Sequence, residues 1–135
     1  AAFHPSGRHL IAVGFKSGMM RVFDVDVPAL LCEHQHHQHP VISLAFVPVL
    51  GAGTLVPSLA QIITCDALGA LAIHDESRGF EVVRTPDRSL CATPPARCSA
   101  MVCVPPRLLQ YFDPQCAALF TYPGLDMVRK LRVTA

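Results

Sequence analysis

The stretch "FHPSGRHLIAVGFKSGMMRVFDV" (residues 3–25) holds two strand-length apolar runs on either side of one short turn. The runs are "HLIAVGF" (9–15) and "MMRVFDV" (19–25), and "KSG" (16–18) joins them. Both runs are rich in β-branched and aromatic residues, which favour strands, and the glycine permits the positive φ that a tight turn requires. The stretch therefore predicts a β-hairpin.

Five further runs of the same kind follow along the chain, each bounded by turn residues. They are "ALLCEH" (29–34), "VISLAF" (41–46), "QIITCD" (61–66), "ALAIHD" (70–75) and "FEVVRT" (80–85). No window of about 11 residues shows the period of 3.6 that an amphipathic helix would produce. The pattern predicts an all-β fold built from short antiparallel strands.

Three features of the opening stretch recur later in the same order: a Phe-x-Pro motif, a turn glycine and a pair that ends in aspartate. The matched positions are Phe3-x-Pro5 with Phe46-x-Pro48, Gly18 with Gly69, and Phe23-Asp24 with His74-Asp75. An insertion at 47–60 lengthens the second copy, and a weaker third copy occupies 100–133 and ends in a strand at 127–133. We therefore predict a structural repeat of strands.

Composition narrows the classes of protein to which the chain can correspond. With 51% apolar and 16% charged residues among 135, it has enough apolar side chains for a core and is too hydrophobic to be disordered. The net charge is +1, and no basic stripe favours nucleic acid or an anionic membrane as a partner. The apolar runs are shorter than the roughly 20 residues of a membrane-spanning helix. The six cysteines have no CxxC spacing, so we expect reduced, mostly buried thiols in the cytoplasm.

The opening stretch resembles the core of a WD repeat, a four-stranded β-propeller blade whose usual period is roughly 40 to 45 residues. In that family a Gly-His pair precedes the first strand, an Asp-Gly turn joins the second and third, and a Trp-Asp pair closes the third. The resemblance covers nearly the whole chain. It places His37 at the family's histidine, Ser17-Gly18 and Leu68-Gly69 at the Asp-Gly turn, and Phe23-Asp24 and His74-Asp75 at Trp-Asp.

This sequence also departs from the family's pattern, because it contains no tryptophan. We therefore expect the family's buried His/Ser/Asp/Trp hydrogen-bond network to be incomplete in both of the clearer repeats. The positions that we predict to be structural, at turns or inside blades, are Gly14, Gly18, Phe23, Asp24, His37, Gly69, His74 and Asp75.

The repeat divides the chain into three predicted blades. The first is 1–34, incomplete at its N-terminal edge; the second is 35–85, with an inserted loop at 47–60; the third, degenerate blade is 86–135. Closing a propeller generally takes at least about four blades. We therefore expect an open portion of a larger multi-blade protein.

The segment "CEHQHHQH" (32–39) concentrates possible metal ligands: Cys32, His34, His36, His37 and His39. Histidines two or three residues apart can converge on Zn²⁺ or Cu²⁺. Alternation along a strand, however, sends neighbouring side chains to opposite faces, and no second ligand cluster has a recognisable spacing. We expect an exposed link between two blades and no bound metal, with a metal-binding protein as an alternative.

The insertion "VPVLGAGTLVPSLA" (47–60) is apolar, although a polar turn would suffice between two strands. Exposed apolar loops commonly mark protein contacts. One interpretation is that its leucines and valine contact a partner; the other is that they fold back onto their own blade. The residues concerned are Leu50, Leu55, Val56 and Leu59.

The sequence contains no GxSxG motif, glycine-rich phosphate loop or HExxH motif, so we predict neither an enzyme nor a cofactor. The resemblance is strongest to the long, multi-propeller WD-repeat proteins of centrioles and cilia. It implies a cytoplasmic, microtubule-associated scaffold whose partners are tubulin or other axonemal or centriolar proteins, and the remaining blades of its own chain. The alternative is a propeller that recruits substrates or partners to a ubiquitin ligase or a signalling complex.

Overall fold

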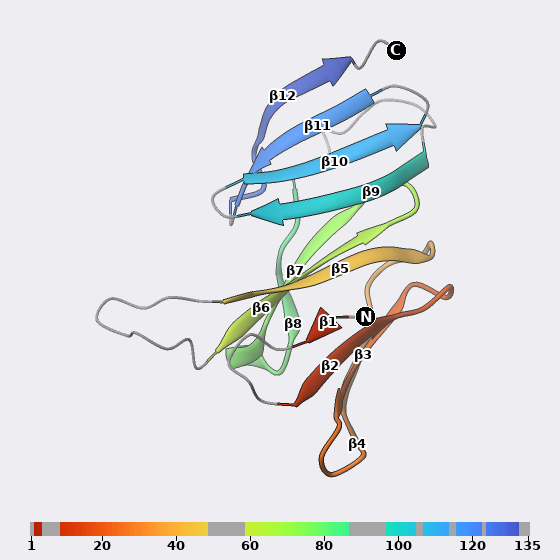
Figure 1. Cartoon of the computed structure of the whole chain (residues 1–135), viewed down its shortest axis with the longest axis vertical. Helices are drawn as coiled ribbons and strands as arrows, with labels where there is room; N and C mark the ends of the chain where they lie inside the picture. Colours follow the sequence, from red (N-terminus) through yellow and green to blue (C-terminus); the bar gives the residue numbers. More distant parts are fainter. Residues whose placement is uncertain are drawn as a thin grey trace, which may run out of the picture.

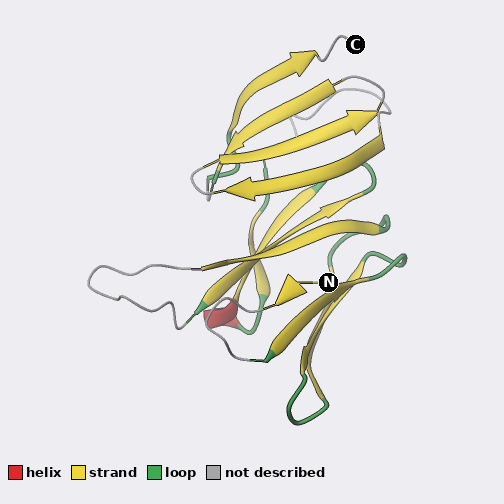
Figure 2. Ribbon diagram, in the orientation of Figure 1, coloured by secondary structure: helices red, strands yellow, loops and turns green. Residues whose placement is uncertain are grey.

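The computed structural model describes residues 2–3, 9–48, 59–86, 97–104, 107–113, 116–122 and 124–132. Within these ranges the chain forms three four-stranded antiparallel sheets (Figures 1 and 2). The described helical structure is a single 3-10 turn, η1 (Glu76–Arg78). No helix among the described residues is long and apolar enough to cross a membrane.

The first sheet has the strand order β1-β2-β3-β4, so each strand pairs with its neighbour in the sequence. Its strands are β1 (Ala2–Phe3), β2 (Leu10–Gly14), β3 (Met19–Asp24) and β4 (Ala29–Gln35). Alternate residues of β2 and β3 point to the buried side, as a period of two predicts.

The second and third sheets repeat this up-and-down order. The second contains β5 (Val41–Pro48), β6 (Ala60–Asp66), β7 (Leu71–Asp75) and β8 (Glu81–Arg84). The third contains β9 (Arg97–Val104), β10 (Arg107–Asp113), β11 (Cys116–Thr121) and β12 (Met127–Arg132).

The predicted all-β fold of four-stranded antiparallel units is confirmed. All seven strands predicted between residues 9 and 85 are present, with ends within a few residues of those expected. The period-two runs and the turn glycines are local signals, so they identify strands without knowledge of the packing.

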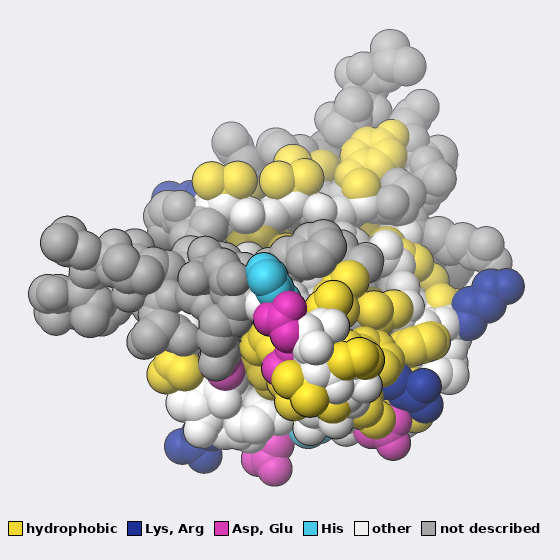
Figure 3. Space-filling model, turned by 60° about the horizontal axis from the view of Figure 1, so that its bottom comes forward, with side chains coloured by type: hydrophobic (Ala, Val, Ile, Leu, Met, Phe, Trp, Pro, Cys, Tyr) yellow, Lys and Arg dark blue, Asp and Glu magenta, His cyan; other side chains and the backbone are white. Residues whose placement is uncertain are grey.

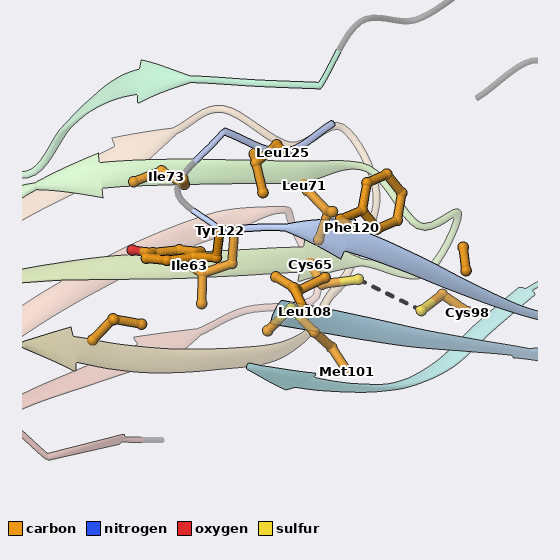
Figure 4. Close-up of a cluster of buried hydrophobic side chains, with 12 residues drawn as sticks. Ile63, Cys65, Leu71, Ile73, Cys98, Met101, Leu108, Phe120, Tyr122 and Leu125 are labelled. Atoms are coloured by element: carbon orange, nitrogen blue, oxygen red, sulfur yellow. Dashed lines mark hydrogen bonds between the residues drawn. The ribbon is translucent and has the colours of Figure 1, made fainter. Parts of the chain in front are cut away.

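The three sheets stack face to face, with the second sheet in the middle (Figure 1). One apolar cluster lies between the first and second sheets and includes Met20, Val22, Ile62 and Phe80. A larger cluster fills the space between the second and third sheets (Figure 4). Its largest members are Ile63, Leu71, Ile73, Met101, Leu108, Phe120, Tyr122 and Leu125. Because it packs on both faces, the second sheet is the most deeply buried, and β6 has only one residue that is not buried.

Candidate functional site

The predicted structural histidine, His37, lies in the link between β4 and β5 and is 3% exposed. Its Nδ1 lies 3.1 Å from Oδ2 of Asp66 at the end of β6. Its Nε2 lies 2.7 Å from the hydroxyl oxygen of Thr64 on the same strand. Because an ionised carboxylate only accepts, Nδ1 carries the hydrogen. The ring therefore anchors the link between the first two sheets to the second strand of the second sheet.

Asp66 closes the turn that follows β6. Its Oδ1 accepts hydrogen bonds from the backbone N–H of Leu68 at 2.9 Å and of Ala70 at 3.0 Å. Burial alone would raise the pKa of this carboxyl, but the hydrogen bonds from His37 and from the two amides outweigh burial and lower the pKa. Asp66 is thus a charged group that the fold holds ionised in a buried position.

His74 lies on β7 on the other side of Thr64 and is 1% exposed. Its Nδ1 donates to the carbonyl oxygen of Phe80 at 2.9 Å, and its Nε2 lies 3.2 Å from the Thr64 hydroxyl. The pKa of His74 is lowered to about 4, chiefly by burial and to a smaller extent by the neighbouring His34, His37 and His36, against the effect of the Phe80 carbonyl, which raises it. His74 is therefore neutral at pH 7.

These four side chains, His37, Asp66, Thr64 and His74, form a continuous chain of buried polar contacts in the second sheet, without the serine and tryptophan of the family's network. His74 is the residue that the resemblance aligned with tryptophan, and the Thr64 hydroxyl lies between the two histidine rings. The resemblance did not indicate Asp66, because it placed the turn aspartate at Leu68, the residue before Gly69. The signal that could have identified it is an aspartate at a strand end, three residues before a turn glycine.

In the first sheet the aligned positions are apolar, as expected. Counting from the turn glycines, Val13 aligns with Thr64, Phe15 with Asp66 and Phe23 with His74. The Phe15 ring lies 5.1 Å below the guanidinium carbon of Arg21, a cation–π contact on the partly exposed side. At these positions the first sheet therefore has half-buried apolar side chains where the second has buried hydrogen-bonding ones.

Three of the predicted glycines lie where a side chain would clash with a neighbour or where the backbone turns tightly. Gly18 has a φ of +88°, and a side chain there would meet the backbone carbonyl of His37. Gln35 secures the approach of these two segments, because its Nε2 donates to the carbonyls of Ser17 at 2.7 Å and His37 at 2.8 Å. Gly14 faces Val41, and Gly69 has a φ of +87° in the corresponding turn of the second sheet.

The two predicted turn aspartates, Asp24 and Asp75, cap backbone amides. Oδ1 of Asp24 accepts from the N–H of Asp26 at 3.0 Å and of Val27 at 3.3 Å. Asp75 directly precedes η1, and its Oδ1 accepts from the N–H of Ser77 at 2.9 Å. Both carboxylates thus stabilise turns, in agreement with their expected positions at the ends of the third strands.

The side chains of the Cys/His segment (32–39) lie in different parts of the structure and do not converge on one point. Cys32 packs against the cluster between the first two sheets, and His34 Nε2 lies 2.9 Å from the Gly79 carbonyl of the second sheet. His37 is buried in the network, while His36 and His39 are exposed. Within the described part of the chain, no group of three or more His, Cys, Asp or Glu residues is arranged to hold a metal ion.

The predicted partner contact lies almost entirely outside the described residues. This is true of Leu50, Leu55 and Val56, whereas Leu59, just before β6, is 41% exposed. Other exposed apolar side chains lie around the β3–β4 turn, which projects at the bottom of Figure 1: Val25, Val27, Leu30 and Leu31. Hydrophobic side chains are also prominent on this side of the molecule in Figure 3.

No protein-family model matches the chain. Over 80 residues, 58% of its length, the chain is 37% identical to centriole proteome protein 16 of Chlamydomonas reinhardtii. Over 72 residues, 53% of its length, it is 38% identical to WD repeat-containing protein 90 of Xenopus tropicalis. The predicted resemblance to WD-repeat proteins is confirmed.

Each of these matches spans only 3% of the relative's own length. Among solved structures, the computationally designed Ika8 protein matches 95% of this chain and 35% of its own, with a TM-score of 0.68 and 12% sequence identity. At that identity the likeness concerns the fold alone.

Because His74 is buried and neutral, we expect the unfolding free energy of the chain to fall in mild acid. Its pKa is about 4 in the folded chain and 6.5 in the unfolded chain, so the unfolded state binds the proton first as pH falls. The contribution of neutral His74 to the free energy of unfolding is complete above about pH 7, decreases between pH 6.5 and pH 4, and is lost below that. The difference of about 2.5 between the pKa values of the unfolded and folded chains corresponds to about 3 kcal/mol of unfolding free energy. Urea unfolding at a series of pH values measures it.

A matched pair of variants separates this effect from other titrations. His74→Phe, which copies Phe23 of the first sheet, should flatten the decrease between pH 6.5 and pH 4. His39→Gln removes an exposed histidine and should leave the decrease in place. A decrease that persists in His74→Phe would assign it to another group.

Proposed function

We propose that the chain is part of a non-catalytic WD-repeat scaffold that mediates protein–protein interaction at the centriole or the ciliary axoneme. The observation that carries the proposal is the identity of 37–38% with two curated proteins, one named for the centriole proteome and the other for its WD repeats. The fold agrees with this role, because stacked four-stranded sheets offer edges and turns to partners without requiring a reaction centre.

The site described above supports a structural role for its polar groups. Each of His37, Thr64, Asp66 and His74 lies within hydrogen-bond distance of another of them, and each is at most 3% exposed. A catalytic acid or base must instead reach its substrate within hydrogen-bond distance. The buried contacts therefore favour a structural role for these four groups.

We assign the scaffold to the cytoplasm and its cytoskeleton, with tubulin or other axonemal or centriolar proteins as partners, together with the remaining blades of its own chain. Tagging the full-length protein and imaging it beside centriole markers tests the location. Mass spectrometry of the complex that purifies with it tests the partners. Enrichment of tubulin or centriolar proteins is expected, whereas ubiquitin-ligase or signalling components would favour the alternative propeller and overturn the proposal.

The apolar insertion gives a residue-level prediction for assembly. Replacing Leu55 and Val56 with serine in the full-length protein should weaken its incorporation into the assembly roughly tenfold, equivalent to about 1.4 kcal/mol, because apolar contact with the partner is lost. Quantitative imaging of the tagged variant at centrioles, with circular dichroism as a check of β content, provides the measurement. Incorporation at the wild-type level, or loss of β content, would instead favour packing of the loop on its own blade.

A further inference from the structure

Two cysteines meet at the contact between the second and third sheets. Cys65 lies on β6 and Cys98 at the start of β9, and their sulfur atoms are 3.5 Å apart (Figure 4). Both side chains are buried, at 0% and 3% exposed. The pair is thus enclosed by the apolar cluster that joins the two sheets.

The backbone around the pair is held in place by hydrogen bonds that cross between the sheets. The N–H of Cys98 donates to the carbonyl of Ala67, one residue past the end of β6, at 2.8 Å. Gln110 of β10 donates to the carbonyl of Gly69 at 2.8 Å and contacts Cys65 Sγ at 3.3 Å. These contacts hold the two cysteines opposite each other while both remain thiols.

We propose that Cys65 and Cys98 are an oxidative modification site, at which hydrogen peroxide converts the thiol pair into a disulfide that cross-links the second and third sheets. A disulfide needs sulfur atoms about 2.05 Å apart, so the gap must close by about 1.5 Å. Rotation of the two side chains about their Cα–Cβ bonds moves the sulfur atoms without separating the backbones.

The electrons and atoms balance in two steps. The Cys98 sulfur attacks one peroxide oxygen, the O–O bond breaks, and the products are a sulfenic acid on Cys98 and one water. The Cys65 sulfur then attacks the Cys98 sulfur, the S–O bond breaks, and the hydroxide leaves with the thiol proton as a second water. Each sulfur is oxidised by one electron overall, and the peroxide is reduced to two waters.

The environment assigns different roles to the two sulfurs. The hydrogen bond between the two sulfur atoms lowers the pKa of Cys98 and favours its thiolate, which is the reactive form. The same hydrogen bond, together with burial, raises the pKa of Cys65. This direction favours Cys98 as the first sulfur to attack peroxide, and the short distance between the sulfur atoms lets Cys65 resolve the product.

Peptide mapping of the 135-residue chain after exposure to hydrogen peroxide tests the proposal. Free thiols are blocked with N-ethylmaleimide, the chain is digested without reductant, and the peptides are identified by mass spectrometry. The Cys65–Cys98 peptide should be at least tenfold more abundant than any cross-link to Cys32 or Cys103, and dithiothreitol should remove it. If both cysteines are recovered carrying N-ethylmaleimide, the proposal is wrong.

Variants and a control in urea test whether the disulfide forms in the folded chain rather than after unfolding. Cys65→Ala and Cys98→Ala should each abolish the cross-link, whereas Cys103→Ala, which removes a half-buried thiol of the same cluster, should leave it unchanged. The cross-link should form faster in native buffer than in urea, because the fold supplies the proximity. Faster formation in urea would overturn the proposal, even if neither alanine variant folds.

Discussion

The Gly18→Ala variant should lose about 4 kcal/mol of unfolding free energy, a large part of the roughly 5–15 kcal/mol that stabilises a typical domain. The reason is twofold. A β-carbon at position 18 would lie against the carbonyl oxygen of His37, 2.6 Å from its carbonyl carbon and 3.0 Å from the carbonyl oxygen of His39. The backbone φ of +88° adds strain for any residue with a side chain. Because the obstructing atoms are backbone, no side-chain rotation can relieve the clash.

Gly79→Ala is the matched control for this result. Gly79 also has a positive φ, of +66°, but no atom lies within 4 Å of a β-carbon built there. It should therefore lose only the strain component, about 1 kcal/mol. Urea unfolding followed by circular dichroism measures both variants. Equal losses would show that the approach of His37 to Gly18 does not contribute to stability.

The strands could be predicted from the sequence because their signals are local. In "HLIAVGFKSGMMRVFDV" (9–25), alternation of apolar residues and one glycine turn suffice to place β2 and β3. The same argument places β6 and β7 around Gly69. Each element is specified by residues that are neighbours in the chain.

The network and the thiol pair could not be predicted in the same way, because they depend on pairings between distant residues. Asp66 meets His37 across 29 positions, and Cys65 meets Cys98 across 33. The family pattern pointed to His37 and His74, but by pairing the turn aspartate with Leu68 it shifted attention away from Asp66. Only the stacking of the sheets shows which polar residues share a buried site.

Removal of the Asp66 carboxylate is the second change with a large expected effect. Asp66→Ala should cost about 4 kcal/mol, because it leaves His37 Nδ1 and the amides of Leu68 and Ala70 without their acceptor. Urea unfolding at pH 7 measures the loss. Asp75→Ala is the control: it removes the cap of a partly exposed turn and should cost about 1 kcal/mol.

Asp66→Asn distinguishes lost hydrogen bonds from lost charge. Its amide oxygen can still accept from the two backbone amides, and its NH₂ group can face His37 if that ring moves its hydrogen from Nδ1 to Nε2. In that tautomer His37 donates to Thr64, whose hydroxyl is then free to donate to His74 Nε2. We therefore expect Asp66→Asn to lose less than half as much stability as Asp66→Ala. If the two variants lose the same amount, the buried charge itself, rather than the pattern of donors and acceptors, determines the strength of the network.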